Sequence, residues 1–153
     1  MIVNFKQILL LLLAMPLFAF ADNGWNDALY KQIEQNVKEP TFVDKTYDIT
    51  KYGASPKAAA ATNQKAINKA IAECTKRGGF RVVVPDGSSN PGAILLKSHV
   101  NLALPKDAKL LFVFDKQLYP VVKTRWEGMD CMNLSPCLSS SQQKDIAITG
   151  EGP

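Results

Sequence analysis

Short apolar runs alternate with polar residues through the second half of the chain. Gly, Pro, Asp, Asn and Ser separate the runs, which is typical of turns between strands. The runs are Arg81–Val84, Ala93–Leu96, Val100–Leu104, Lys109–Phe114 and Ile146–Ile148. This pattern predicts at least five short strands between Arg81 and Thr149.

Two arrangements of these strands fit the pattern. Antiparallel hairpins favour Asn-Gly or Asp-Gly in two-residue loops, and only Pro85-Asp86-Gly87 comes near that signal. A parallel β-solenoid stacks equivalent strands from successive coils and needs short turns in each coil. The segments Val100–Leu104 and Asp145–Thr149 resemble each other but lie further apart than one short coil. Periodicity alone therefore leaves both arrangements open.

Helical patterns come before the strands. Trp25, Leu29, Ile33 and Val37 recur at every fourth position, which predicts one amphipathic helix ending before Pro40. The segment 41–54 that follows is rich in β-prone residues, and it closes on the turn residues Gly53 and Pro56.

A second helix is predicted with Thr62 or Asn63 as its N-cap. It ends with Lys76 and Arg77, which complement the helix dipole, before the stop signal Gly78-Gly79. Its apolar face, which we expect to be a packing surface, consists of Ala66, Ile67, Ala70, Ile71 and Cys74.

The first 21 residues have the pattern of a secretory signal peptide. Lys6 precedes the apolar run Ile8–Phe20, and Ala19-Phe20-Ala21 is a small-x-small cleavage site. The alternative is a membrane anchor, but the run is short for a bilayer and Pro16 interrupts it. We therefore expect an exported protein, periplasmic or extracellular, without stable membrane insertion after cleavage. Residues 22–46 would form an N-terminal helix and extended lead-in, and residues 47–153 the second helix and the strands.

Composition narrows the chemistry further. The net charge of +4 comes from scattered residues, without the basic block that marks a nucleic-acid-binding protein. Cys131 and Cys137 are near enough in sequence to pair, whereas Cys74 lies on the apolar helix face. His99 is the only histidine, and no Cys/His spacing suggests a metal or cofactor site. The aspartates of the strand region are spaced like turn residues, and Lys97 and Lys109 are expected on the outer face.

Several motifs together resemble one family. They read YDITKYGA (47–54), AINKAIAECTKRGG (66–79), RVVVPDG (81–87), GAILLKSHVNLAL (92–104), YPVVKTRWEGMDCMNLSP (119–136) and DIAITGEG (145–152). As a set they resemble the N-terminal part of glycoside hydrolase family 28, the polygalacturonase-like, pectin-degrading enzymes of the pectate-lyase-like superfamily. The resemblance implies a right-handed, single-stranded parallel β-helix, of which this chain holds the first coils. It also implies that the helix over Ala66–Cys74 is an N-terminal cap that covers the open end of the first coil.

The family hydrolyses α-1,4 galacturonosyl bonds in pectin with inversion. Inversion needs two carboxyl groups about 6.5–9.5 Å apart, so that a water molecule fits between them and the sugar. The family carries them in Asn-Thr-Asp and Asp-Asp motifs, with Gly-His-Gly and Arg-x-Lys motifs that help bind the uronate. None of these motifs occurs in this sequence, and His99 matches no catalytic histidine. We therefore expect a part of a glycosidase truncated before its catalytic coils, with no catalytic residue and no activity of its own.

Substrate binding is the one function that this sequence suggests directly. Arg125 would pair with a uronate carboxylate, Trp126 would stack on a sugar ring, and Glu127 would orient either. The structural alternative is that Trp126 packs against the coil while Arg125 and Glu127 form a surface ion pair. The expected partner is a polygalacturonate-type polysaccharide.

A second functional class stays open. Similar first coils also occur in non-catalytic proteins of the superfamily, so the chain would then be a carbohydrate-binding or structural β-helix module. In either case the last coil would expose an apolar edge, and we expect self-association through that open C-terminal coil.

Overall fold

The computed structural model describes residues 27–151, so the expected signal peptide, its cleavage site and Trp25 lie outside the described part. The chain divides into two compact units, with the boundary between Glu39 and Pro40. The described part of the first unit contains helix α2 (Asp27–Asn36), which confirms a helix before Pro40. Its apolar residues are exposed, so the expected stripe buries nothing within this helix. Within residues 27–151, no helix is long and apolar enough to cross a bilayer.

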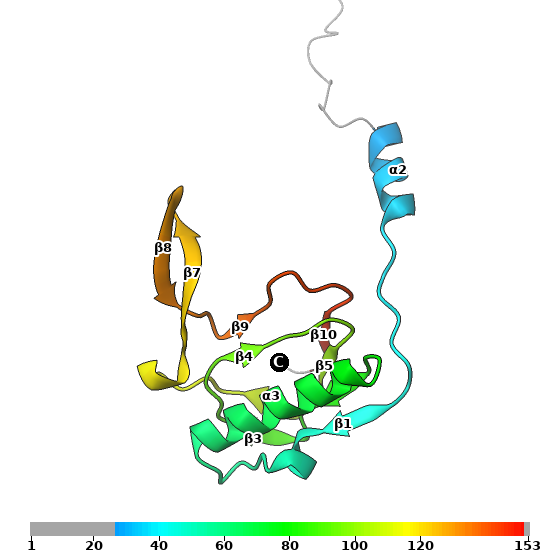
Figure 1. The fold of residues 1–153 in the computed structure, drawn as a ribbon. Coiled ribbons are helices and arrows are strands. Elements are labelled where there is room, and N and C mark those ends of the chain that lie inside the picture. Colours follow the sequence, from blue (N-terminus) through cyan, green and yellow to red (C-terminus); the bar gives the residue numbers. More distant parts are fainter. Residues whose placement is uncertain (1–26, 152–153) are drawn as a thin grey trace, which may run out of the picture. The chain divides into compact units, whose positions relative to one another are not determined.

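The second unit is built on a parallel coil (Figure 1). Its largest sheet has the order β1-β2-β5-β10, formed by β1 (Thr46–Asp48), β2 (Arg81–Val83), β5 (Asn101–Leu104) and β10 (Ala147–Gly150). Arg81 pairs with Asn101, and Asn101 pairs in turn with Ala147. All three pairings are parallel.

Two further parallel pairs complete the walls of the coil. Strand β3 (Gly87–Ser89) pairs with β6 (Ala108–Leu110), and β4 (Ile94–Leu95) pairs with β9 (Leu138–Ser139). The parallel solenoid is therefore confirmed over the antiparallel arrangement for these strands. The segments Val100–Leu104 and Asp145–Thr149 contain neighbouring strands after all, because an inserted segment lengthens the coil between them.

Strands β7 (Val121–Trp126) and β8 (Met129–Leu134) form that insertion and pair antiparallel. Between them, Glu127 and Gly128 have φ angles of 47° and 87°. Positive φ at both central residues is what a tight hairpin turn needs. The prediction that only Pro85-Asp86-Gly87 comes near a hairpin turn was therefore wrong. The turn at Glu127-Gly128 was missed because glutamate is not among the residues that usually precede glycine in such a turn.

Helix α3 (Ala60–Lys76) lies against β1, β2, β4 and the 3-10 helix η1 (Ile49–Tyr52). Its predicted packing face is confirmed, since Ala66, Ile67, Ala70, Ile71 and Cys74 are all buried. The predicted N-cap was wrong: the cap position is Ala59, without a side-chain bond.

Asn63 lies inside the helix, where its amide bonds to the preceding loop instead of capping the helix. Its Oδ1 accepts the N–H of Ser55 at 2.9 Å, and its Nδ2 donates to the carbonyls of Ser55 and Ala58. The loop before the helix is thereby tied to a fully buried side chain.

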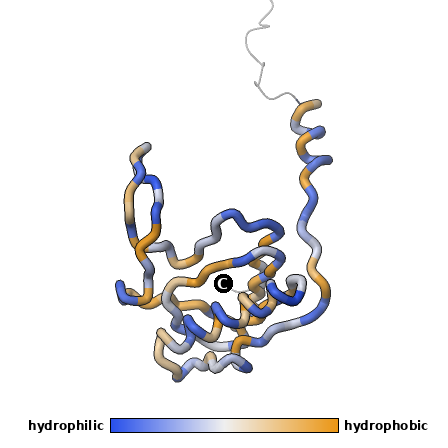
Figure 2. Tube along the Cα trace, in the orientation of Figure 1, coloured by the Kyte–Doolittle hydropathy of each residue, from blue (hydrophilic) through white to orange (hydrophobic). Residues whose placement is uncertain are grey.

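The core lies between α3 and the walls of the coil. Val82 and Leu102 occupy matching positions of adjacent coils, and Val84, Ile94 and Val100 are buried beside them. Figure 2 shows that apolar residues recur along the coil in this unit. The core is thus concentrated in the first coils and under the helix.

Candidate functional site

The hairpin β7–β8, which we call the arm, is the most exposed element of the second unit. It is inserted between the 3-10 helix η2 (Lys116–Leu118) and β9, and in Figure 1 it rises beside β4 and β9. At its base the N–H of Ser135 donates to the carbonyl of Pro120 at 2.8 Å. The arm is therefore closed at its base before the chain returns to the coil.

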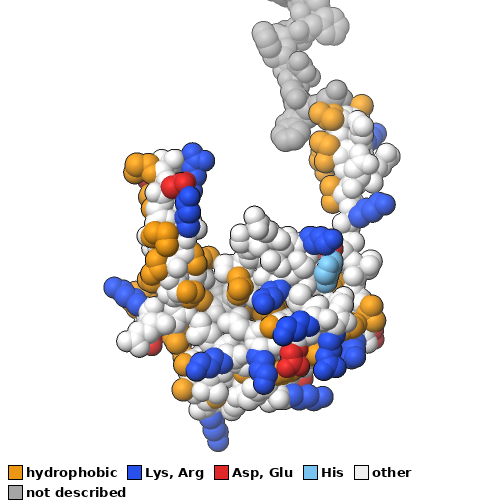
Figure 3. Space-filling model, viewed as in Figure 1, with side chains coloured by type: hydrophobic (Ala, Val, Ile, Leu, Met, Phe, Trp, Pro, Cys, Tyr) orange, Lys and Arg blue, Asp and Glu red, His pale blue; other side chains and the backbone are white. Residues whose placement is uncertain are grey.

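The two faces of the arm differ in charge. Cross-strand partners share a face in an antiparallel pair. One face carries Lys123, Arg125 and Asp130, with a Lys123–Asp130 ion pair of 3.0 Å. The other, which we call the uncharged face, carries Val122, Thr124, Trp126, Met129, Cys131 and Asn133. In Figure 3 apolar atoms lie along one side of the arm and charged atoms along the other.

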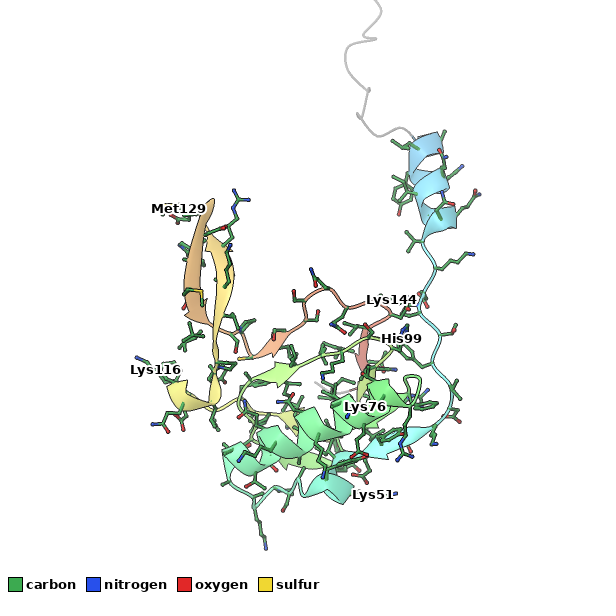
Figure 4. All side chains as sticks on the ribbon, in the orientation of Figure 1. Lys51, Lys76, His99, Lys116, Met129 and Lys144 are labelled. Carbon is green, nitrogen blue, oxygen red and sulfur yellow. The ribbon has the colours of Figure 1, made fainter. Side chains whose placement is uncertain are left out.

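Trp126 and Met129 form the outer end of the uncharged face. They are direct cross-strand partners, and their relative exposures are 66% and 70%. Figure 4 shows Met129 at the tip of the arm. An exposed indole beside a thioether offers a flat apolar surface of the kind on which the C–H face of a sugar ring packs.

The structure does not bring the three predicted binding residues together. Arg125 and Trp126 are consecutive strand residues and lie on opposite faces. The Nε of Arg125 donates to the carbonyl of Gly128 at 3.1 Å, and Glu127 lies in the turn. The structural alternative fits no better, because Trp126 is exposed and no Arg125–Glu127 ion pair occurs in the described residues. A binding role for these residues stays a prediction.

A groove of about 380 Å³ lies at the base of the arm. We call it the base groove. Its lining comes from α3, from the region of β4, from the base of the arm and from β9: Gln64, Asn68, Ala93, Ile94, Leu95, Lys97, Pro120, Val122, Ser135 and Ser139. Sequence reasoning missed this site because its segments are distant along the chain. Their parallel stacking and the inserted hairpin bring them together, and no local motif signals either.

Two amides of α3 hold the floor of the base groove. The Nε2 of Gln64 donates to the carbonyls of Ala93 and Leu118, at 3.0 and 2.7 Å. Asn68 donates to the Ala93 carbonyl and accepts the N–H of Leu95 at 2.9 Å. Three of these bonds hold β4 and the preceding Ala93 against the helix, and the fourth ties η2 to it.

Other reactive groups have structural surroundings. Cys74, Cys131 and Cys137 are all free thiols, so Cys131 and Cys137 do not pair in this structure. Burial raises the pKa of the Cys74 thiol, and the hydrogen bond from the Phe80 N–H opposes this to a smaller extent. Among the described residues, no group of His, Cys, Asp and Glu side chains could hold a metal ion.

The last described coil leaves an apolar hollow of about 520 Å³. We call it the terminal hollow, and its apolar lining includes Leu104, Leu110, Phe112, Leu138 and Ile148. Ile148 is 52% exposed, although its register partner Leu102 is fully buried one coil earlier. The hollow is a surface of the kind that a further coil or a second molecule would cover.

Comparison with known proteins gives structural matches. Neither protein-family models nor curated protein sequences match the chain. An exopolygalacturonase of Thermotoga maritima matches with a TM-score of 0.74 and 32% identity, over 82% of this chain and 28% of that enzyme. A family 28 exopolygalacturonase of Yersinia enterocolitica matches with a TM-score of 0.60 and 26% identity, over 71% of this chain and 20% of that enzyme.

A third structure shares the fold. A protein of Parabacteroides merdae has a TM-score of 0.58 and 24% identity, over 69% of this chain and 43% of its own length. The chain therefore spans less than half the length of each of these three solved structures.

Proposed function

We propose, from the polygalacturonase-like fold that this chain has, that it is the N-terminal part of a glycoside hydrolase acting on polygalacturonate. The observation that carries the proposal is the match to the Thermotoga exopolygalacturonase, at 32% identity over 82% of this chain. The whole protein would hydrolyse α-1,4 galacturonosyl bonds with inversion. It would be exported, since its substrate is an extracellular polysaccharide and its first residues have the pattern of a signal peptide.

In this proposal the described coils serve as a scaffold. The β-helix would be right-handed, and α3 would cap its first coil, where it already lies against β1, β2 and β4. Capping removes an open apolar end that would otherwise promote aggregation. The catalytic carboxylates would be supplied by further coils after Pro153, because none of the family's catalytic motifs occurs in residues 1–153. The 153-residue chain alone would then be inactive.

A non-catalytic carbohydrate-binding module is the second candidate. The uncharged face of the arm favours it, because Trp126 and Met129 are cross-strand partners that lie exposed together at its outer end. Sugar binding is common to both candidates, so a binding measurement does not separate them, whereas an activity measurement does.

A chimera tests the catalytic proposal. Residues 40–151 would replace the matching segment of the Thermotoga exopolygalacturonase, and galacturonate release from polygalacturonate would be measured. We expect the chimera to be active, and both the 153-residue chain and the Thermotoga enzyme lacking that segment to be inactive. A folded chimera without hydrolysis would contradict the proposal, as would hydrolysis by the purified chain alone. Reading the coding sequence beyond the Pro153 codon for Asn-Thr-Asp and Asp-Asp motifs is an independent check.

A further inference from the structure

We propose that the base groove is a uronate-binding subsite, in which Lys97 pairs with the carboxylate of a galacturonate residue and the Ser135 hydroxyl bonds to the sugar. The inference rests on the proposed function, because it takes the substrate class from there. It assigns a binding role to two residues that no motif identifies.

Charge is the first argument. Among the described residues, Lys97 is the only charged one that lines the base groove. Within residues 27–151 its ammonium group has no ion pair and no side-chain hydrogen bond, and no acidic residue lines the groove. A single positive charge among neutral side chains favours an anionic ligand over a neutral or cationic one. A uronate carries one carboxylate on each sugar residue, which matches this lining.

Ser135 is the second and independent argument. The residue is only 7% exposed, and its Oγ has no hydrogen-bond partner among the described residues. Buried polar side chains are normally paired, so an unpaired hydroxyl lining a groove indicates a partner from outside the chain. The Oγ itself is buried just beneath the groove surface, so a sugar hydroxyl reaches it once the side chain turns outward, and it can then donate to Ser135 or accept from it.

The groove is also held in shape before any ligand arrives. The amides of Gln64 and Asn68 are engaged with the backbone around Ala93, so they fix the floor. Its volume of about 380 Å³ lies within the range of small-molecule sites, roughly 300–1,000 Å³. Preorganisation of this kind reduces the ordering cost that a ligand meets on binding.

The apolar part of the lining suits the other side of a sugar. Pro120 and Val122 form a wall against which the C–H face of a ring can pack. Val122 also belongs to the uncharged face of the arm, which continues through Thr124 to Trp126. A ligand longer than one sugar therefore has an uncharged surface to follow out of the groove.

The test is an isothermal calorimetric titration of the complete chain with trigalacturonate. The fully methyl-esterified trisaccharide serves as the uncharged control ligand. We expect binding of trigalacturonate that weakens with added salt, and little binding of the ester. Lys97→Met should lower the affinity at least tenfold, and Lys97→Arg should retain most of it. Lys109→Met, which removes an exposed lysine of β6 outside the groove, should leave the affinity unchanged.

Ser135→Ala should lower the affinity for trigalacturonate several-fold. The melting temperature of this variant shows whether it is folded. Equal affinities of wild type and Lys97→Met would overturn the inference, as would equal binding of acid and ester, or no binding by wild type.

The inference and the proposed function fail separately. An active chimera whose KM is unchanged by Lys97→Met would contradict the subsite inference and support the proposed function. Lys97-dependent binding of trigalacturonate, together with a folded but inactive chimera, would support the subsite inference and contradict the proposed function.

Discussion

The Nδ1 of His99 lies 3.1 Å from the Oδ2 of Asp145, and both residues have positive φ, at 63° and 53°. Each lies two residues before a strand position of the shared register, Asn101 and Ala147. Gly79, with φ of 85°, lies in the same place before Arg81. The three residues therefore form a column of left-handed positions where successive coils enter the large sheet. The sequence leaves His99 without a role, but the structure places it in this column. Its N–H donates to the carbonyl of Lys144 at 3.0 Å, and the two residues are labelled near each other in Figure 4.

Gly79→Ala tests this column. A Cβ at Gly79 would overlap the Cβ and the carbonyl oxygen of His99, and the backbone there is left-handed. We expect a loss of about 2–5 kcal/mol in the free energy of unfolding, since a left-handed alanine costs roughly 1–2 kcal/mol and overpacking about 1–3 kcal/mol. Gly78→Ala is the matched control, because φ is 104° but nothing lies within 4 Å of its Cβ. Chemical denaturation of both variants gives the comparison, and equal losses would contradict the proposed clash.

Asn63 offers a second stability test. Asn63→Leu removes three hydrogen bonds with the segment 55–58 and leaves the Ser55 N–H without this partner. We expect a loss of about 2–4 kcal/mol, because unsatisfied buried polar groups cost roughly 1–3 kcal/mol each. Asn133→Leu is the control, since the side chain of Asn133 is exposed and, within residues 27–151, accepts a hydrogen bond only from the N–H of its neighbour Leu134. A loss no larger than that of the control in urea denaturation would show that the loop does not depend on Asn63.

Sequence patterns predicted the parts of this fold that are locally encoded. The α3 face from Ala66 to Cys74 repeats with helical period, and Arg81–Val83 follows a strong stop at Gly78-Gly79, so both could be predicted. The pairing of β5 with β10 could not, because a hairpin of unknown extent separates them. For the same reason, side chains from α3, β4 and the arm gave no sign that they share a groove. Arg125 and Trp126 show the opposite case: neighbours in sequence that the strand places on opposite faces.

Cys74 makes stability depend on pH in the alkaline range. Its pKa is raised above the ordinary thiol value of 9.0 by burial, so the folded state keeps the proton that the unfolded state releases. The contribution of Cys74 to the free energy of unfolding should therefore be constant below about pH 8 and fall as the pH rises through 9 towards the folded pKa. Cys74→Ala should reduce this slope. It should not abolish it, because Tyr52 and Tyr119, whose pKa values are also raised, remain in both proteins. Identical slopes from pH 8 to 10 would rule out the thiol as the cause.

The same burial predicts thiol reactivity. Cys131 and Cys137 should react with a maleimide under native conditions, whereas Cys74 should react only after unfolding. Mass spectrometry of the labelled peptides identifies the sites. Rapid native labelling of Cys74 would mean that α3 opens readily from the coil.

Trp126 and Arg125 can be separated by their faces. If a polyuronate leaves the base groove along the uncharged face of the arm, Trp126→Ala should weaken trigalacturonate binding several-fold, because stacking on the indole is lost. Arg125→Ala should then have little effect beyond a small change in salt dependence. The reverse result would place the ligand on the charged face. Arg125 would then bind the carboxylate, as predicted from the sequence.

Self-association should occur through the terminal hollow. Ile148 lies there, half exposed beside Leu104 and Leu110, and contact between two such hollows would remove apolar surface from water. We expect the sedimentation coefficient of the 153-residue chain to rise with concentration. Ile148→Glu should suppress this rise, because the new charge would be buried in the contact. Val43→Glu places the same charge on an exposed apolar residue that does not line the hollow, and it should leave the association unchanged. If both variants sediment like the wild type, the molecules associate elsewhere. A wild-type chain that stays monomeric at high concentration would show that the hollow is stable in water as it is.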